Sequence, residues 1–216
     1  MQSFYDEATG LFDVYLLKYK SESLKNFKQY MALCENQANC RLKIIHTDGA
    51  FSNWDDYCRK RGIVHKVLLP YTPEQNGRAE HFNRTVMRPV RSILYKKKLS
   101  KFCWGEITHG VIHTLNQSPL DDDFKSTFEC LQGKKSYLGH LKILECQVWV
   151  HIPKEKRKKL NEYTWQGILV EYDFTNQYHI LNPHTGKVYI TQDAHFNELH
   201  MYNKKELLSA DFKDEE

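Results

Sequence analysis

An alternation of strand and helix signals over the first seventy residues limits the fold more than any other feature. β-Branched and aromatic residues predict strands at 12–17, 42–47 and 63–69. Between them, residues 21–34 carry apolar side chains at three- and four-residue steps after a serine, and residues 53–58 begin a shorter helical pattern. Strands and helices that alternate at these lengths are typical of an α/β domain.

The middle of the chain predicts two further helices. A stretch of proline, glycine and polar residues at 70–77 is typical of a loop, and a helical pattern follows at 78–99. Pro89 removes a backbone donor inside that pattern, so we expect a kink or an early break there. Residues 102–115 predict a second helix, which ends before Pro119.

From about residue 145 the pattern changes to short strands separated by turns. Short strands at close spacing predict a small antiparallel barrel. The expected strands are 146–152, 166–172, 177–181 and 187–191. We therefore expect an α/β domain at 1–132, a linker at 133–144, the barrel at 145–200 and a tail at 201–216.

Cysteine usage and hydropathy exclude several classes of protein. The six cysteines are scattered over 216 residues without a Cys-x-x-Cys pair, which argues against a disulfide scaffold and against a zinc knuckle. The longest apolar stretch is far shorter than the roughly 18–20 residues of a membrane span. Residues 1–7 lack the basic and apolar parts of a signal peptide. We therefore expect an intracellular protein without a membrane partner.

Two carboxylates stand where a ligand site would form. Asp48 directly follows an apolar strand, and the carboxyl ends of strands line the crevice in which α/β domains bind ligands. Glu80 lies in the first turn of the long predicted helix. Two carboxylates that meet over a crevice can hold Mg²⁺ or Mn²⁺. The alternatives are an Asp48 that caps a turn, and a surface ion pair between Glu80 and Arg84 worth less than ~1 kcal/mol.

Basic residues gather locally although the net charge is only +4. Residues 81–105 contain no acidic residue and carry seven cations: Arg84, Arg88, Arg91, Lys96, Lys97, Lys98 and Lys101. A second cluster comprises Lys154, Lys156, Arg157, Lys158 and Lys159, and a third comprises Arg59, Lys60, Arg61 and Lys66. Each cluster alone is compatible with a solvated surface. Three in one chain favour contact with the backbone of a nucleic acid.

A weaker metal-binding pattern lies on the helix predicted at 102–115. His109 and His113 are four residues apart, and Glu106 precedes them. A third ligand from the same stretch is not evident, so ordinary buried or surface histidines are the favoured interpretation.

Several of these segments resemble a known family. The motifs are His46-Thr47-Asp48-Gly49, the run from Pro70 to Thr85 (PYTPEQNGRAEHFNRT), residues 102–106 (FCWGE) and residues 115–119 (LNQSP). Together they resemble the integrase core of copia-type retrotransposon Pol polyproteins. Residues 150–160, 167–170 and 182–188 resemble the SH3-like domain that follows this core. The resemblance implies a ribonuclease-H-like fold followed by an SH3-like β-barrel.

The resemblance also implies roles for individual residues. The family holds two divalent metals, Mg²⁺ or Mn²⁺, with an Asp, Asp, Glu triad, and two such ions stabilise the attacking and leaving oxygens of a displacement at phosphorus. By motif, Asp48 is the second carboxylate and Glu80 the third, both catalytic and metal-binding. Asn76 belongs to the loop beside the site. The expected nucleic-acid-binding residues are Asn76, Asn83, Arg84, Arg88, Arg91, Lys156, Arg157, Lys158 and Lys159.

The partners implied by the resemblance are DNA and further copies of the chain. The DNA would be the ends of the retroelement cDNA and the target DNA, and an integrase acts in the nucleus. Its role in the family is DNA integration, by 3′-end processing and strand transfer.

Three departures from the family lead us to expect an inactive chain. The strand with the family's first catalytic Asp, which is the central strand of the sheet, lies upstream of the segment that Phe4-Tyr5-Asp6 resembles. The His/His/Cys/Cys zinc module is absent, and the interval between Asp48 and Glu80 is shorter than usual. Loss of the central strand would leave two rows of backbone groups without partners. The alternatives are a non-catalytic protein that binds DNA or RNA and an SH3-like protein-interaction module.

Overall fold

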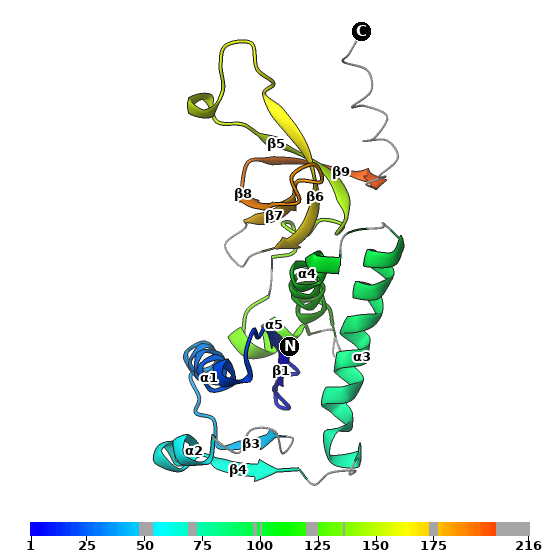
Figure 1. The fold of residues 1–216 in the computed structure, drawn as a ribbon. Helices are drawn as coiled ribbons and strands as arrows, with labels where there is room; N and C mark the ends of the chain where they lie inside the picture. The colour runs from blue at the N-terminus through cyan, green and yellow to red at the C-terminus, as the bar shows by residue number, and fades with distance from the viewer. Residues whose placement is uncertain are drawn as a thin grey trace. The chain divides into compact units, whose positions relative to one another are not determined.

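The backbone packs into two compact units, each of which contains two separate stretches of sequence (Figure 1). The first unit comprises Met1–Thr85 and Leu115–Ser136, and the second comprises Val86–Thr114 and Tyr137–Glu216. The computed structural model describes residues 1–47, 54–68, 73–96, 99, 101–119, 125–135, 137–172 and 177–201.

The first unit alternates strands and helices, which confirms the α/β pattern. Its elements are β1 (Gln2–Tyr5), β2 (Phe12–Tyr15), the 3₁₀ turn η1 (Lys20–Glu22), α1 (Ser23–Ala38), β3 (Ile44–Thr47), α2 (Asp55–Arg61), β4 (Val64–Val67), the start of α3 (Pro73–Lys96) and α5 (Thr127–Gln132). The sequence pattern did not predict α5. Ser126 caps this short helix, since its hydroxyl accepts a hydrogen bond from the Glu129 N–H at 3.2 Å.

The strands of the first unit form two separate pairs. β1 and β2 are antiparallel, with Tyr5 opposite Phe12, whereas β3 and β4 are parallel, with Thr47 opposite Val67. Within the described residues the two pairs share no strand-to-strand hydrogen bonds.

An aromatic cluster gives both strand pairs one hydrophobic core. Phe4 of β1 stacks on Tyr30 of α1 with ring centroids 4.6 Å apart, and Phe27 of α1 stacks on Trp54 at 4.5 Å. Trp54 directly precedes α2 and is almost fully buried. Burial of such large apolar surfaces is the dominant favourable term in folding, so this cluster holds the unit together where strand pairing does not.

A buried asparagine supplies hydrogen bonds at the outer edge of β2. The Phe12 N–H donates to Asn116 Oδ1 at 3.2 Å, and Asn116 Nδ2 donates to the Phe12 carbonyl at 2.7 Å. Asn116 lies near the end of α4 (Trp104–Gln117) and is buried. Its amide group therefore satisfies the two backbone groups that a further strand would otherwise satisfy.

The helix α3 corrects two predictions. Residues 73–77, expected in a loop, form its first turns, because a proline is tolerated where the helical N–H has no acceptor. The helix also continues past Pro89 to Lys96, so the expectation of an early break was wrong. Val86 and Val90, on either side of the proline, are buried and anchor the helix by packing.

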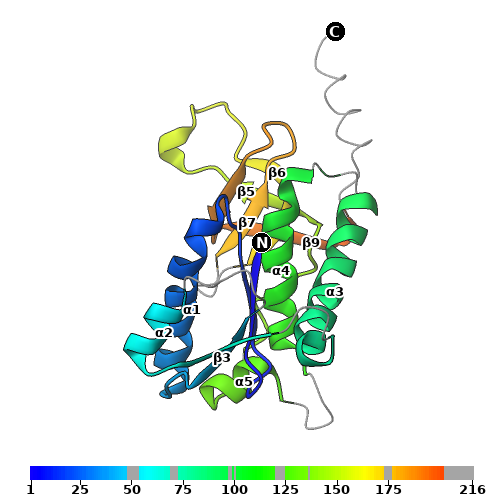
Figure 2. The same cartoon turned by 60° about the horizontal axis from the view of Figure 1, so that its bottom comes forward.

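The second unit contains a five-stranded antiparallel sheet in the order β8-β7-β6-β5-β9. The strands are β5 (Cys146–His151), β6 (Thr164–Tyr172), β7 (Tyr178–Leu181), β8 (Val188–Thr191) and β9 (Ala194–Met201). The first four confirm the predicted strands, and β9 was not predicted. The core of this sheet includes Val148, Leu169 and Ile180. Figure 2 shows β5, β6, β7 and β9 from a second side.

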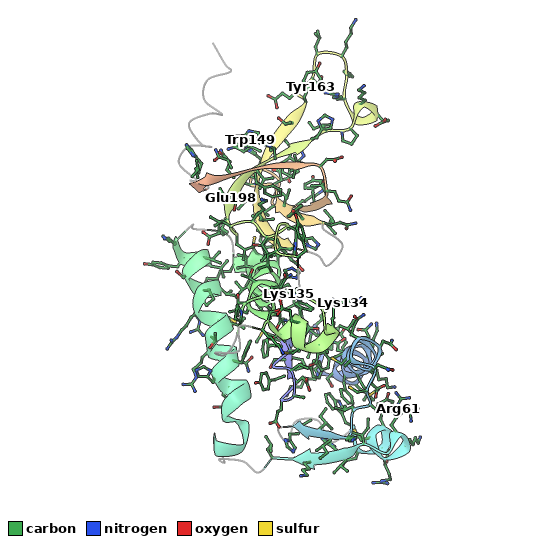
Figure 3. The ribbon with its side chains drawn as sticks, turned by 180° about the vertical axis from the view of Figure 1, so that it is seen from behind. Arg61, Lys134, Lys135, Trp149, Tyr163 and Glu198 are labelled. Carbon is green, nitrogen blue, oxygen red and sulfur yellow. The ribbon has the colours of Figure 1, made fainter. Side chains whose placement is uncertain are left out.

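An acidic residue of β9 fastens the segment that leads into this sheet. Glu198 accepts a hydrogen bond from the Ile143 N–H at 3.1 Å and lies 3.4 Å from Lys142 Nζ (Figure 3).

Among the helices of the described residues, none is both long and apolar enough to cross a membrane.

Candidate functional site

The end of β3, where the sequence places the first candidate carboxylate, is held by a histidine. Thr47 Oγ1 lies 2.7 Å from His65 Nε2, and His65 Nδ1 pairs with the carboxylate of Asp55. The imidazole thus joins β3, β4 and α2. Asp48 follows Thr47 in the sequence but lies outside the described residues, so its distance from Glu80 stays a prediction.

The order carboxylate, imidazole, hydroxyl also occurs in the catalytic triads of hydrolases. Here the hydroxyl belongs to Thr47, and only 7% of the surface of this residue is exposed to solvent. A nucleophile needs access to its substrate, so this contact is better suited to fixing the end of β3 than to nucleophilic catalysis.

Glu80 is exposed on the first turns of α3. The alternative ion pair with Arg84 does not form, and Glu80 makes no other ion pair or hydrogen bond with the described part of the chain. A carboxylate without a partner among the described residues can accept a cation, and the ligand role of Glu80 stays a prediction.

The expected nucleic-acid-binding residues of α3 differ in exposure. Arg84, Arg88 and Arg91 are exposed and follow one another at four- and three-residue steps, so they lie along one side of the helix. Asn83 is half-buried, and its Oδ1 has no hydrogen-bond partner among the described residues. The side chain of Asn76 lies outside the described residues.

The basic loop between β5 and β6 is partly packed rather than wholly solvated. The Arg157 guanidinium lies over the ring of Tyr163, 4.0 Å from its centroid, where β6 begins (Figure 3). Lys158 and Lys159 are exposed, and the side chain of Lys156 lies outside the described residues. Stacking of the arginine orders the loop that presents the two lysines.

The third basic cluster is partly neutralised by acidic neighbours. Arg61, at the end of α2, lies 3.3 Å from Glu35 of α1, and Arg59 lies 3.8 Å from Asp56 (Figure 3). Exposed pairs of this kind contribute little stability. They do reduce the positive potential of the cluster, so it is the weakest of the three candidates for phosphate contact.

A titratable cluster in the second unit combines residues that the sequence did not connect. His179 Nδ1 of β7 lies 3.0 Å from a carboxylate oxygen of Glu106 in α4 and 3.0 Å from one of Glu171 in β6. His113, which the sequence paired with Glu106, instead places its Nε2 3.2 Å from that of His140. The two partners of Glu106 come from distant strands, so no local spacing could have revealed them.

The electrostatics of this cluster follow from its burial and charge. Hydrogen bonds to Glu106 and Glu171 raise the pKa of His179 to about 10. The hydrogen bond from His179 lowers the pKa of Glu106 to about 2. Burial is the main cause that raises the pKa of Glu171 to about 7, and the neighbouring carboxylate of Glu106 adds to the increase.

The chain is similar to retrovirus-related proteins over most of its length. Residues 146–210 match the family described as the retroviral polymerase SH3-like domain. Over 202 residues, 91% of the chain, it is 33% identical to the retrovirus-related Pol polyprotein from transposon TNT 1-94 of Nicotiana tabacum, of which it covers 15%. Over 199 residues, 90% of the chain, it is 27% identical to the corresponding polyprotein from transposon RE2 of Arabidopsis thaliana, of which it covers 14%.

The fold is similar to that of solved structures. An example is a chain in the cryoEM structure of the simian T-cell lymphotropic virus intasome in complex with PP2A regulatory subunit B56 gamma. The TM-score is 0.50 at 16% sequence identity, and the match covers 93% of the present chain and 70% of the other.

Together these matches show that the chain is similar to retrovirus-related Pol proteins. More particularly, it resembles the copia-type retrotransposon Pol polyproteins, as the motifs predicted, and residues 146–210 match an SH3-like domain. It spans about 15% of the length of the curated relatives that it matches.

Proposed function

We propose that the chain is a nucleic-acid-binding segment of a retrotransposon integrase, with a ribonuclease-H-like core and an SH3-like domain. The family role of such a segment is DNA integration by 3′-end processing and strand transfer. Similarity to Pol polyproteins over 91% of the chain supports the proposal. The observation that carries it is the exposed side of α3, on which Glu80 precedes Arg84, Arg88 and Arg91.

The strand pairs of the first unit support the proposed core. A ribonuclease-H-like sheet would place one further strand between the pair β1–β2 and the pair β3–β4. The two pairs are separate within the described residues, yet Phe4 and Trp54 belong to one aromatic cluster. The separation of the two strand pairs and their common core are both compatible with a sheet of this kind.

In this proposal the carboxylates and arginines have different tasks. Glu80, with Asp48, would hold Mg²⁺ or Mn²⁺, which activates the attacking oxygen and stabilises the leaving one. Arg84, Arg88 and Arg91 would bind phosphate oxygens through charge-assisted hydrogen bonds. A helix side that carries both kinds of group can hold a phosphodiester beside the metal ligands.

Binding to DNA is tested by fluorescence anisotropy with labelled duplex at several salt concentrations. Binding should weaken steeply with salt, since each phosphate contact adds ~0.9 to the slope of log K against log salt. Changing Arg88 and Arg91 together to Ala, or Lys158 and Lys159 together to Ala, should each lower this slope by roughly 1–2. The matched control changes the exposed Lys20 and Lys25 to Ala and should leave the slope unchanged. Absence of salt-dependent binding would favour a protein-interaction module instead.

We further propose that these 216 residues by themselves bind DNA without joining its ends. Two of the three family carboxylates have counterparts, Asp48 and Glu80, and a metal site with one ligand missing binds more weakly. The test is a strand-transfer assay with the purified chain in Mn²⁺, with Glu80→Gln as the control. Joined product that disappears in the control would show that the chain is active.

A further inference from the structure

We propose that Glu106, Glu171 and His179 form a binding site for a divalent transition-metal ion such as Zn²⁺. This site is distinct from the carboxylates considered for DNA chemistry and does not depend on that function. One ligand atom from each residue lies within 4.8 Å of the other two. His179 Nδ1 is 3.0 Å from a carboxylate oxygen of each glutamate.

The fold holds the three side chains on regular elements rather than on loops. Glu171 of β6 and His179 of β7 are opposite one another, next to a register shift that follows Leu169. Such irregularities re-aim a side chain relative to its neighbours in the strand. Without this shift, regular pleating would place the glutamate and the histidine on opposite faces of the sheet. With the shift, the two side chains converge.

Glu106 reaches the pair because α4 packs closely against β6. A Cβ on Gly110 would lie 2.8 Å from the Val170 carbonyl oxygen, closer than real Cβ atoms come to a backbone oxygen. Glycine at this position lets the helix approach the strand, and Glu106 is one turn earlier on the same helix. Ligands on packed elements of this kind are well oriented.

The spacing of the ligand atoms suits one ion. Zinc binds histidine nitrogen and carboxylate oxygen at about 2.0–2.2 Å, so ligand atoms around a tetrahedral ion stand roughly 3.4 Å apart. The separations of 3.0 Å from His179 Nδ1 need to open by only a few tenths of an ångström. Three protein ligands leave a fourth position for water.

Charge balance also favours a divalent cation. The side chains of His179, Glu106 and Glu171 are 18%, 35% and 16% exposed. Two carboxylates, a neutral imidazole and a divalent ion together carry no net charge, which suits a half-buried place.

The test measures metal binding by the full chain after metal has been stripped. Cys40 and Cys130, the exposed thiols among the described residues, are changed to Ser in every protein to remove competing sites. Isothermal titration with Zn²⁺ should give one site whose affinity falls at least tenfold in Glu171→Gln and in His179→Gln. The matched control His151→Gln, exposed on β5 of the same sheet, should keep the affinity.

Cobalt supplies a second readout that needs no variant at the site. Co²⁺ should give the visible bands of a four- or five-coordinate ion without a thiolate charge-transfer band, because the ligands are nitrogen and oxygen. Absence of stoichiometric binding, a thiolate band, or equal affinity in His179→Gln and His151→Gln would overturn the proposal. The three residues would then form only an ion-paired cluster, in which the protonated His179 holds the two glutamates by hydrogen bonds. Circular dichroism of each metal-free variant establishes that the fold is retained.

Discussion

The two hydrogen bonds of Asn116 offer the sharpest test of how the first unit is held together. Changing Asn116 to Ala removes both partners of the Phe12 backbone, and Phe12 is 0% exposed. A buried backbone group without a partner costs about 1–3 kcal/mol. Two such groups cost about 2–6 kcal/mol, and the better helix propensity of alanine returns about 0.5 kcal/mol. The expected net loss is therefore about 2–5 kcal/mol.

Hydrogen exchange measured by mass spectrometry reports this loss at the affected strands. Since about 1.4 kcal/mol corresponds to a factor of ten, protection of the β1–β2 amides should fall at least thirtyfold. The control Asn36→Ala makes the same change at an exposed position of α1 and should leave this protection nearly unchanged. If protection in Asn116→Ala falls less than about fivefold, roughly 1 kcal/mol, Asn116 does not replace a strand partner.

Two further predictions concern pH and close packing. Glu171 and His179 bind protons more tightly in the folded state, with pKa values of about 7 and about 10 against ordinary values of 4.5 and 6.5. Thermal melting of the metal-free chain should therefore show stability falling as pH rises from 4.5 to 7 and again from 6.5 to 10, and Glu171→Gln should remove the first fall. Gly110→Ala should destabilise by about 1–3 kcal/mol in urea unfolding, because its Cβ meets the Val170 carbonyl. Gly77→Ala on α3, where the added Cβ meets nothing within 4 Å outside its own helical backbone in the described part of the chain, should instead stabilise by about 0.5–1 kcal/mol, and a loss there would contradict the argument.

Much of the fold was predictable because it rests on local patterns. The strands β2, β3 and β4 and the helices α1 and α2 lie within a few residues of their predicted positions, and so do β5 to β8. Side-chain periodicity and turn residues act over one element, so they can be recognised along the chain. The same locality explains the errors at residues 73–77 and at Pro89, where packing of Val86 and Val90 outweighs the breaking tendency of proline.

The candidate site was likewise predictable from the sequence only in part. Motifs led to Glu80 and the arginines of α3, whose exposure the structure shows, whereas Asp48 lies outside the described residues. The partners of two basic residues were not predictable, since Glu35 approaches Arg61 only after α1 and α2 have packed on the same core. Two residues inside the family motifs make contacts that the motifs did not predict: Asn116 donates to the Phe12 carbonyl at the edge of β2, and Glu106 pairs with His179 of β7.

The sequence by itself determined the alternating α/β pattern, the short strands of the second unit and the similarity to retrotransposon Pol polyproteins. Each of these depends on neighbours along the chain or on motifs that relatives share. Only the tertiary structure decided that the strands of the first unit stand as two pairs over one aromatic core, and that Glu106, Glu171 and His179 meet. Convergence of distant residues depends on backbone register and helix packing, and these are properties of the folded chain as a whole.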